Sequence, residues 1–288
     1  MAPGTNIVKI YNRFKPSEAI FRCPACHTDM KFRNENSLVC LKNHCFDLSK
    51  HGYINFVPNQ GKMKYTKDLF ESRRHIFKSG FYDPLIKRIE SCVYEHLGMD
   101  PQTNILDVGC GEGFFISNLF GSDKRIGGIF GLDIFKDAVV LAAKGNSAVN
   151  WIVGDLSNIP LRSDTMGLLL NIFSPANYGE FSRIMADSGI LIKVIPGKHY
   201  LKELRECVKE KFIKPDYSNE QVVKYFSKSM LSLDGSNLCY QLPVNNYDLD
   251  NFIKMTPMMF NVDIDKIDLH NVNQITIDVE IMIGKKQI

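Results

Sequence analysis

A glycine-rich turn with acidic neighbours is the part of this sequence best suited to hold a ligand. Three glycines alternate between residues 109 and 113, directly after the apolar run Asn104–Val108. A buried strand that leads into such a turn lets the backbone approach a ligand closely, and the helix that follows presents free N–H groups. The same glycines could also form a tight turn without a ligand. The residues expected to face the ligand are Asp107, Gly109, Gly111, Glu112 and Gly113.

Two further aspartates make the pattern more specific. Asp133 ends the next apolar run and Asp155 ends the third. An acid at the end of the second strand is placed to accept hydrogen bonds from ribose hydroxyls. The glycines lack the G-x-G-x-x-G spacing of dinucleotide enzymes, and Glu112 disfavours a pyrophosphate but tolerates a sulfonium and an amino acid. The segment Ile105–Gly113 therefore resembles class I S-adenosylmethionine-dependent methyltransferases more than dinucleotide enzymes, and by that resemblance Asp155 lies near the adenine amine.

Four metal-binding side chains gather near the start of the chain. Cys23 and Cys26 form a Cys-x2-Cys pair, and Cys40 and His44 form a Cys-x3-His pair after an interval of thirteen residues. Two such pairs on short turns close a tetrahedral zinc site, whose binding energy helps to fold a unit this small. Cys45 adjoins His44 and is an alternative fourth ligand; we favour His44 because its spacing suits zinc. A site closed by four protein ligands predicts structural zinc.

Charge is distributed unevenly along the 288 residues. The first 90 carry 16 Lys and Arg against 8 Asp and Glu, and the remainder carries 19 against 24. A basic front end allows contact with a polyanion, although a solvated basic face is the alternative. Among the basic residues expected to meet phosphate are Lys31, Arg33, Lys42, Lys50, Lys62, Lys64, Lys67, Arg73 and Arg74.

The hydrophobic pattern predicts the elements that position these groups. Short apolar runs end near residues 108, 133, 154, 171 and 194, and helical intervals separate most of them, as in a buried parallel sheet. Helices are expected over Asp68–Ser79 and from Pro84 to Leu97, and alternating edge strands near the end of the chain. A short strand within Gly52–Pro58 is expected to close the zinc unit. No apolar run reaches the roughly 18 to 20 residues that span a membrane, and no secretory signal is present, which predicts a cytoplasmic protein.

The domain organisation follows from these patterns. We expect a zinc-binding domain over residues 1–60, a linker and connecting helix over 61–80, and a methyltransferase domain over 81–288. The small front domain would contribute to RNA recognition through its basic side chains, whereas its aromatic side chains could either stack on bases or pack the zinc core.

Several segments, in order along residues 20 to 260, carry a closer resemblance. Beyond the zinc pattern and the glycine turn they are Lys50–Asn55, Ser72–Phe77, Gly80–Leu85, Pro196–Leu201 and Met255–Pro257. Together they resemble the RlmA family of bacterial ribosomal RNA guanine-N1 methyltransferases. The zinc pattern and Pro196–Leu201 are specific to that family, whereas all class I methyltransferases share the glycine turn.

This resemblance implies a Rossmann-like α/β fold with a mostly parallel sheet of seven strands behind a small zinc-binding domain. It implies S-adenosylmethionine and structural zinc as cofactors. The methyl acceptor it implies is N1 of a guanine in a hairpin loop of 23S ribosomal RNA, and a homodimer is compatible with it. By position, the zinc ligands match Cys23, Cys26, Cys40 and His44, and cofactor contacts match Tyr82, Gly111, Glu112 and His199.

The segment Asn171–Pro175 follows the fourth predicted strand, where the methyl donor should point. Phe173 could stack on the guanine and Asn171 could bond to its edge; a simple strand end is the alternative. Asn171 also departs from the family, in which an Arg occurs at this position. Methyl transfer to guanine N1 requires loss of the N1 proton, and no residue identifies itself as the base.

Two other functions use the same features. A small-molecule methyltransferase with a zinc-stabilised lid would share the core, and a non-catalytic RNA-binding protein would share the front end. The basic front end argues against the first. The intact glycines, with Asp133 and Asp155, argue against the second.

Overall fold

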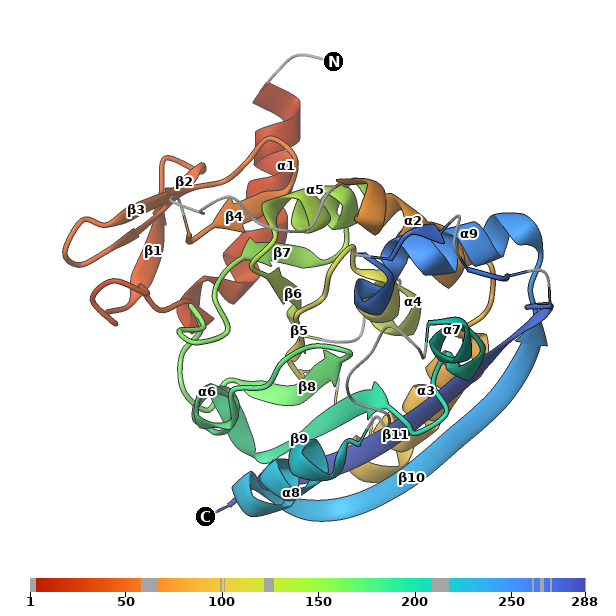
Figure 1. The fold of residues 1–288 in the computed structure, drawn as a ribbon. Coiled ribbons are helices and arrows are strands. Elements are labelled where there is room, and N and C mark those ends of the chain that lie inside the picture. The colour runs from red at the N-terminus through yellow and green to blue at the C-terminus, as the bar shows by residue number, and fades with distance from the viewer. Residues whose placement is uncertain are drawn as a thin grey trace.

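A computed structural model describes residues 4–57, 67–98, 100, 102–121, 127–208, 218–260, 262–264, 267–269 and 271–287. One large sheet runs through the molecule with helices on both faces, and a small three-stranded sheet lies at one end (Figure 1). None of the helices within these ranges is both long and apolar enough to cross a membrane.

The large sheet has eight strands, of which the six from β9 to β4 run parallel to one another. The two remaining strands are antiparallel, as predicted for the end of the chain. The predicted α/β class with a mostly parallel sheet is therefore confirmed. In order across the sheet the strands are β10 (Met230–Pro243), β11 (Gln274–Lys286), β9 (Met185–Pro196), β8 (Met166–Ile172), β5 (Ile105–Val108), β6 (Ile129–Asp133), β7 (Asn150–Val153) and β4 (Tyr53–Asn55).

Strand β4 is the eighth strand, and it differs from the expectation that it closes the zinc unit. It pairs in parallel with β7, with Tyr53 beside Trp151 and Ile54 beside Ile152. Tyr53 is buried on one face of the sheet and Ile54 on the other, and a strand buried on both faces is typical of a parallel sheet. The seven strands expected of the class are present, and the front of the chain adds one at the β7 edge.

Helices cover the two faces of the sheet through two separate apolar cores. Alternation along β5 divides its side chains, with Ile105 in one core and Leu106 in the other. The first core is covered by α3 (Asp83–Leu97), α4 (Phe114–Phe120), α5 (Lys136–Gly145), α7 (Lys202–Cys207) and α9 (Asn246–Met255). The second is covered by α6 (Tyr178–Ile184), α8 (Glu220–Ser229) and the front of the chain.

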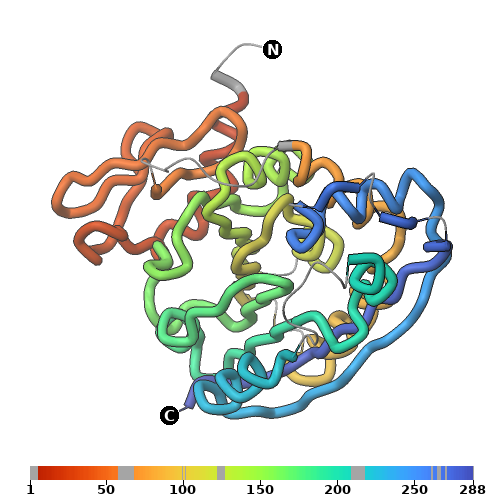
Figure 2. Tube along the Cα trace, viewed as in Figure 1, coloured from red at the N-terminus to blue at the C-terminus, as the bar shows by residue number. Residues whose placement is uncertain are grey.

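The front of the chain packs directly against the sheet. It consists of α1 (Gly4–Phe14), the 3-10 helix η1 (Lys15–Ile20), β1 (Met30–Arg33), β2 (Ser37–Cys40) and β3 (Cys45–Asp47). Phe21 is fully buried, and its ring centroid lies 6.1 Å from that of Phe130 on β6. The front unit therefore shares the second core, at the end of the sheet opposite the long β10–β11 pair (Figure 2).

Helix α2 (Lys67–Lys78) lies where a helix was predicted over Asp68–Ser79. It lies beside α9, and the His75 imidazole and the Asp248 carboxylate join the two helices at 2.7 Å. The predicted boundary at residue 60 and the predicted linker residues 61–66 lie outside the described residues.

Candidate functional site

The glycine turn joins β5 to α4 with the backbone that its sequence predicts. Gly109, Gly111 and Gly113 have φ angles of 76°, 55° and 78°, a left-handed conformation that glycine adopts without strain. The amides of Gly109 and Cys110 both donate to the carbonyl of Leu132 on β6, at 2.8 and 3.0 Å. The neighbouring strand therefore fixes the turn in place.

Steric contacts distinguish the three glycines. A Cβ atom on Gly113 would lie 2.2 Å from the Trp151 ring, and one on Gly109 would lie 1.9 Å from Ser174 Oγ. A Cβ atom on Gly111 would meet nothing closer than the Arg73 guanidinium, at 3.5 Å. Gly111 is therefore the glycine that borders open space rather than packed side chains.

A cavity of about 260 Å³ lies over this turn, at the carboxyl ends of β5 and β8. The end of β9 and the residues after α9 complete its walls. A cavity at the carboxyl ends of parallel strands is the usual ligand site of such a sheet. Five of the nine residues predicted to bind the cofactor line it, namely Tyr82, Asp107, Gly109, Gly111 and Glu112.

Glu112 gives the clearest sign that the cavity receives a polar ligand. Glu112 is only 8% exposed, and neither of its carboxylate oxygens has a hydrogen-bond partner among the described residues. Burial raises the pKa of this carboxyl to about 7, although the charge of Arg73 opposes the shift. A buried polar group without partners is unfavourable. A ligand with hydroxyl or ammonium donors would satisfy both oxygens.

Glu112 belongs to a group of three buried carboxyls. Burial, reinforced by the charges of Asp133 and Glu112, raises the pKa of Asp107 to about 8. Burial also raises the pKa of Asp133. A cationic ligand would lower all three pKa values, because an opposite charge favours the ionised carboxylate. The cavity therefore suits a sulfonium, an ammonium and ribose hydroxyls, and it disfavours a pyrophosphate.

Asp133 makes a contact that the sequence did not reveal. Its two oxygens accept hydrogen bonds from the amides of Gly111 and Phe135, both at 2.8 Å, and it is not among the residues that line the cavity. Asp133 therefore holds the turn against β6. Because a carboxylate oxygen can accept more than one hydrogen bond, its contact with ribose stays a prediction.

Three other predicted contacts lie outside the cavity lining. Gly113 is the N-cap residue of α4. Asp155 follows β7 and accepts a hydrogen bond from the Ser157 amide at 2.8 Å. His199 is exposed, and its amide donates to Asp278 at 2.6 Å. Direct contact of these three residues with the cofactor stays a prediction.

Phe173, one of the two residues predicted to meet the guanine, forms part of the cavity wall. Its φ angle is 53°, which is a strained conformation for an aromatic residue and is typical of functional sites. Its ring centroid lies 5.5 Å from that of Tyr200 and 5.9 Å from that of Tyr82. The strained backbone turns the chain out of β8 and presents this ring to the cavity.

Asn171, the other predicted residue, is fully buried within the sheet. Its amide donates to the carbonyls of Val108 and Pro175, both at 3.0 Å. Its oxygen accepts a hydrogen bond from Lys193 Nζ at 2.5 Å. These bonds occupy both ends of the side chain. The placement therefore argues against a bond between Asn171 and the edge of a base.

Among the cavity residues that sequence reasoning missed are Tyr200 and Thr256, and Arg73 has a position that it did not predict. Arg73 was assigned to RNA phosphate, but its side chain lines the cavity near Glu112. Tyr200 also lines it, and its hydroxyl pairs with that of the buried Tyr82 at 2.5 Å. Thr256 closes the cavity from the segment after α9. The signal for Tyr200 and Thr256 was their position within segments that carry the family resemblance.

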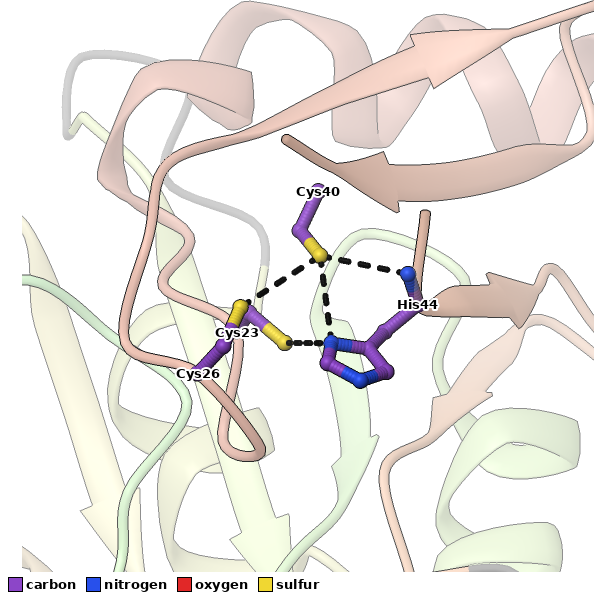
Figure 3. Close-up of side chains that lie close together, drawn as sticks. All are labelled: Cys23, Cys26, Cys40 and His44. Atoms are coloured by element: carbon purple, nitrogen blue, oxygen red, sulfur yellow. Dashed lines mark hydrogen bonds between the residues drawn. The ribbon is translucent and has the colours of Figure 1, made fainter. Parts of the chain in front are cut away.

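The zinc pattern forms one cluster in the front unit (Figure 3). The ligand atoms of Cys23, Cys26, Cys40 and His44 all lie within 4.8 Å of one another. His44 Nδ1 is 3.5 Å from Cys23 Sγ and 3.3 Å from Cys40 Sγ, and the Cys26 and Cys40 sulfurs are 3.5 Å apart. A tetrahedral zinc separates its sulfur ligands by about 3.8 Å. Three thiols and one imidazole at these distances fit structural zinc.

Two tight turns bring these ligands together. The His27 amide donates to the Cys23 carbonyl at 2.8 Å, and the Asn43 amide donates to the Cys40 carbonyl at 2.9 Å. Both donor residues have positive φ angles, as expected for tight turns around a metal site. Cys45 is exposed, and its thiol donates to Asp47 at 3.7 Å instead of joining the cluster. The geometry therefore favours His44 over Cys45.

The aromatic side chains of the front unit pack inward. The rings of Phe46 and Phe56 lie 4.8 Å apart, and those of Tyr11 and Phe32 lie 5.3 Å apart. Packing of the small core, rather than stacking on RNA bases, accounts for these residues.

The strand order and the acidic glycine turn at the end of β5 define a class I S-adenosylmethionine-dependent methyltransferase. Residues 106–192 match the methyltransferase domain model, and residues 21–64 match the zinc-ribbon model described as RlmA, N-terminal. The methyltransferase interpretation is thus confirmed over the dinucleotide one, and the cofactors are S-adenosylmethionine and structural zinc.

Two relatives match almost the whole chain. A Bacillus subtilis (strain 168) protein named "Putative 23S rRNA (guanine-N(1)-)-methyltransferase YxjB" is 36% identical over 277 residues, which are 93% of this chain and 98% of that protein. The 23S rRNA (guanine(748)-N(1))-methyltransferase of Streptomyces fradiae is 25% identical over 265 residues, which are 90% of this chain and 94% of that protein. The chain belongs to the RlmA family of methyltransferases.

Proposed function

We propose that this protein transfers a methyl group from S-adenosylmethionine to N1 of a guanine in a hairpin loop of 23S ribosomal RNA. One observation carries the proposal: the zinc cluster and the acidic cavity occur in one chain that aligns along nearly its full length with relatives named for this reaction. We place the enzyme in the cytoplasm, where it would meet ribosomal RNA.

The cavity residues would hold the cofactor, which supplies an electrophilic methyl group on a sulfonium. Glu112 would accept hydrogen bonds from ribose hydroxyls, since its oxygens have no partner among the described residues. The Gly111 position would admit the cofactor against the backbone. Asp107 and Tyr82 would border the amino acid portion, and Asp133 would keep the turn in place. Asp155 and His199 would contact the outer parts of the cofactor.

The front unit would recognise the RNA. Its zinc cluster, held by Cys23, Cys26, Cys40 and His44, fixes the turn at residues 40–44, on which Leu41 and Lys42 are exposed. Lys31 and Arg33 are exposed on the adjacent strand β1. Basic side chains on a rigid turn are suited to phosphate contacts around a hairpin loop. We propose residues 1–60 as the RNA-recognition domain and residues 81–288 as the methyltransferase domain, joined by residues 61–80.

Incubation of the zinc-loaded protein with tritiated S-adenosylmethionine and unmodified 23S ribosomal RNA tests the proposal. Label should appear in a single fragment of the RNA and not in 16S ribosomal RNA or in a metabolite extract. Label in small molecules alone would favour the methyltransferase with a zinc-stabilised lid. Binding of RNA without binding of the cofactor would indicate a non-catalytic protein.

A homodimer is also part of the proposal. Within the described residues β10 is an edge strand of the sheet, and Leu231 and Leu233 on it are exposed. An exposed apolar edge strand favours self-association. Light scattering of the purified protein should give twice the mass of the chain, and the mass of a monomer at micromolar concentration would contradict this arrangement.

A further inference from the structure

A second cavity, of about 400 Å³, adjoins the cofactor cavity. It lies at the carboxyl ends of β8 and β9 and is bordered by α8, which contributes Gln221, Val222 and Tyr225. Phe173 and Pro196 line both cavities. A group bound in the second cavity therefore reaches the cofactor cavity past the Phe173 ring.

Lys193 is the cationic side chain of this second cavity. It is only 2% exposed, and its Nζ donates to Asn171 Oδ1 at 2.5 Å and to the Ser174 carbonyl at 3.1 Å. An ammonium has three N–H donors, so one remains for a ligand. Burial lowers the pKa of Lys193 to about 8. The amine is therefore mostly protonated at neutral pH, without a carboxylate partner.

Three aromatic residues, Phe173, Tyr178 and Tyr225, also line this cavity. Tyr178 is 3% exposed, and its hydroxyl has no hydrogen-bond partner among the described residues. Tyr225 packs against it, with ring centroids 4.8 Å apart, and is 54% exposed. Phe173 stands at the junction with the cofactor cavity. Flat aromatic surfaces, an unpartnered buried hydroxyl and an unpaired cation suit a planar base that carries an acceptor oxygen.

We propose that the second cavity binds the flipped-out target guanine and that Lys193 Nζ donates a hydrogen bond to its O6. This inference rests on the proposed function and names the residue that makes N1 reactive. When the N1–H bond breaks, the proton passes to water at the open side of the cavity and the negative charge spreads onto O6, next to the ammonium. N1 then forms a bond to the methyl carbon as the carbon–sulfur bond breaks, and the electron pair of that bond stays on sulfur.

Asn171 acts here as a positioning residue. Its oxygen holds Lys193, and its amide is fixed by the carbonyls of Val108 and Pro175. The two residues face one another on neighbouring strands, since Asn171 on β8 is in register with Lys193 on β9. The ammonium is thereby oriented before the guanine arrives, as electrostatic stabilisation of a developing oxyanion requires.

Lys193→Met tests the proposal in single-turnover methyl transfer to a ribosomal hairpin. Loss of one preorganised donor should slow the step by about 10²-fold or more at pH 7, while affinities for the cofactor and the hairpin change little. The deficit should shrink towards pH 9.5, because guanine N1 then ionises without help and Lys193 itself loses its proton. Lys193→Arg, which keeps the charge, should recover part of the rate.

Two outcomes would overturn the inference. One is a Lys193→Met enzyme as fast as the wild type, and the other is a deficit of equal size at pH 7 and pH 9.5. If the wild type still produces 1-methylguanosine, either outcome overturns only the role of Lys193 and not the proposed function. Absence of 1-methylguanosine from the wild-type reaction would refute the proposed function itself. Unchanged cofactor affinity shows that the variant is folded.

Tyr225→Ala tests the aromatic wall independently, because an exposed ring can be removed without disturbing the core. It should weaken binding of the hairpin about 5-fold or more, because stacking of a base on an aromatic ring contributes about 1–3 kcal/mol to binding. Tyr94→Ala is the matched control, since Tyr94 is 74% exposed on α3. Equal affinities for the two variants would show that the guanine does not bind against Tyr225.

Discussion

Substitution of Glu112 by Gln should make the cofactor-free protein more stable and its cofactor binding weaker. Burial raises the pKa of this carboxyl from 4.5 to about 7, so its ionised form is less favourable in the folded chain than in the unfolded one. At about 1.4 kcal/mol per pKa unit, the penalty at pH 7 and above is about 3 kcal/mol. The neutral amide has the same shape and removes this penalty.

The pH dependence gives the sign of this effect. Below pH 4.5 the carboxyl is protonated in both states, so the variant and the wild type should have similar free energies of unfolding. Between pH 4.5 and 7 the wild type loses stability relative to the variant, because folding then opposes ionisation. Urea unfolding at pH 4.5 and at pH 7.5 measures the difference, with Glu90→Gln, an exposed site on α3, as the control.

Cofactor affinity completes this test. Glu112→Gln should bind S-adenosylmethionine at least about 10-fold more weakly at pH 7.5, since hydrogen bonds to an ionised group are worth about 1.5–3 kcal/mol. Isothermal titration calorimetry measures both affinities. A variant that is no more stable than the wild type at pH 7.5 and binds the cofactor equally well would refute the reasoning about this cavity.

Three further predictions concern the turn, the zinc cluster and the buried lysine. Gly113→Ala should lower the free energy of unfolding by about 3 kcal/mol, because Gly113 has a positive φ angle and an added Cβ would clash with Trp151. Gly111→Ala should lower the free energy of unfolding by only about 1 kcal/mol but abolish cofactor binding. Equal urea midpoints for the two variants would contradict this prediction. Cys40→Ser should release zinc, measured by a chromogenic chelator, and unfold the front unit, while Cys45→Ser should retain the metal. Between pH 8 and 10.5, the free energy of unfolding of the wild type should rise relative to that of Lys193→Met, by about 3 kcal/mol at most. The reason is that burial disfavours the charged form of Lys193, which loses its proton in the folded protein at lower pH than in the unfolded chain. Parallel pH profiles for the two proteins would exclude a buried charge.

The sequence predicted the features that depend on neighbouring residues. The five parallel strands from residues 104 to 194 were recognisable because each is a short apolar run and helices separate most of them. The zinc ligands were recognisable because each pair lies on one turn. Strand β4 was expected only to close the zinc unit, but it also pairs with β7, since the pattern at Gly52–Pro58 shows a strand but not its partner. Pairing with β7 depends on contacts almost 100 residues away, which periodicity does not reveal.

The chemistry of the site was harder to predict than its location. Asn171 is polar at the end of a strand and was expected to face the base, but its side chain turns into the sheet and bonds to Lys193. Lys193 itself looked like an ordinary residue within an apolar strand. A lysine in such a run is an exception to the pattern, because charged side chains are almost never fully buried unless paired. That exception was the available signal for the second cavity.

The product of the reaction tests the central claim most directly. Unmodified 23S ribosomal RNA should be treated with the zinc-loaded protein and S-adenosylmethionine, digested to nucleosides and analysed by mass spectrometry against authentic standards. We predict one new 1-methylguanosine per molecule, at a guanine in a hairpin loop, and none when Glu112→Gln replaces the wild type at low cofactor concentration. Methylation at another atom or another base, or no methylated nucleoside from a zinc-loaded protein that binds the cofactor, would contradict the account.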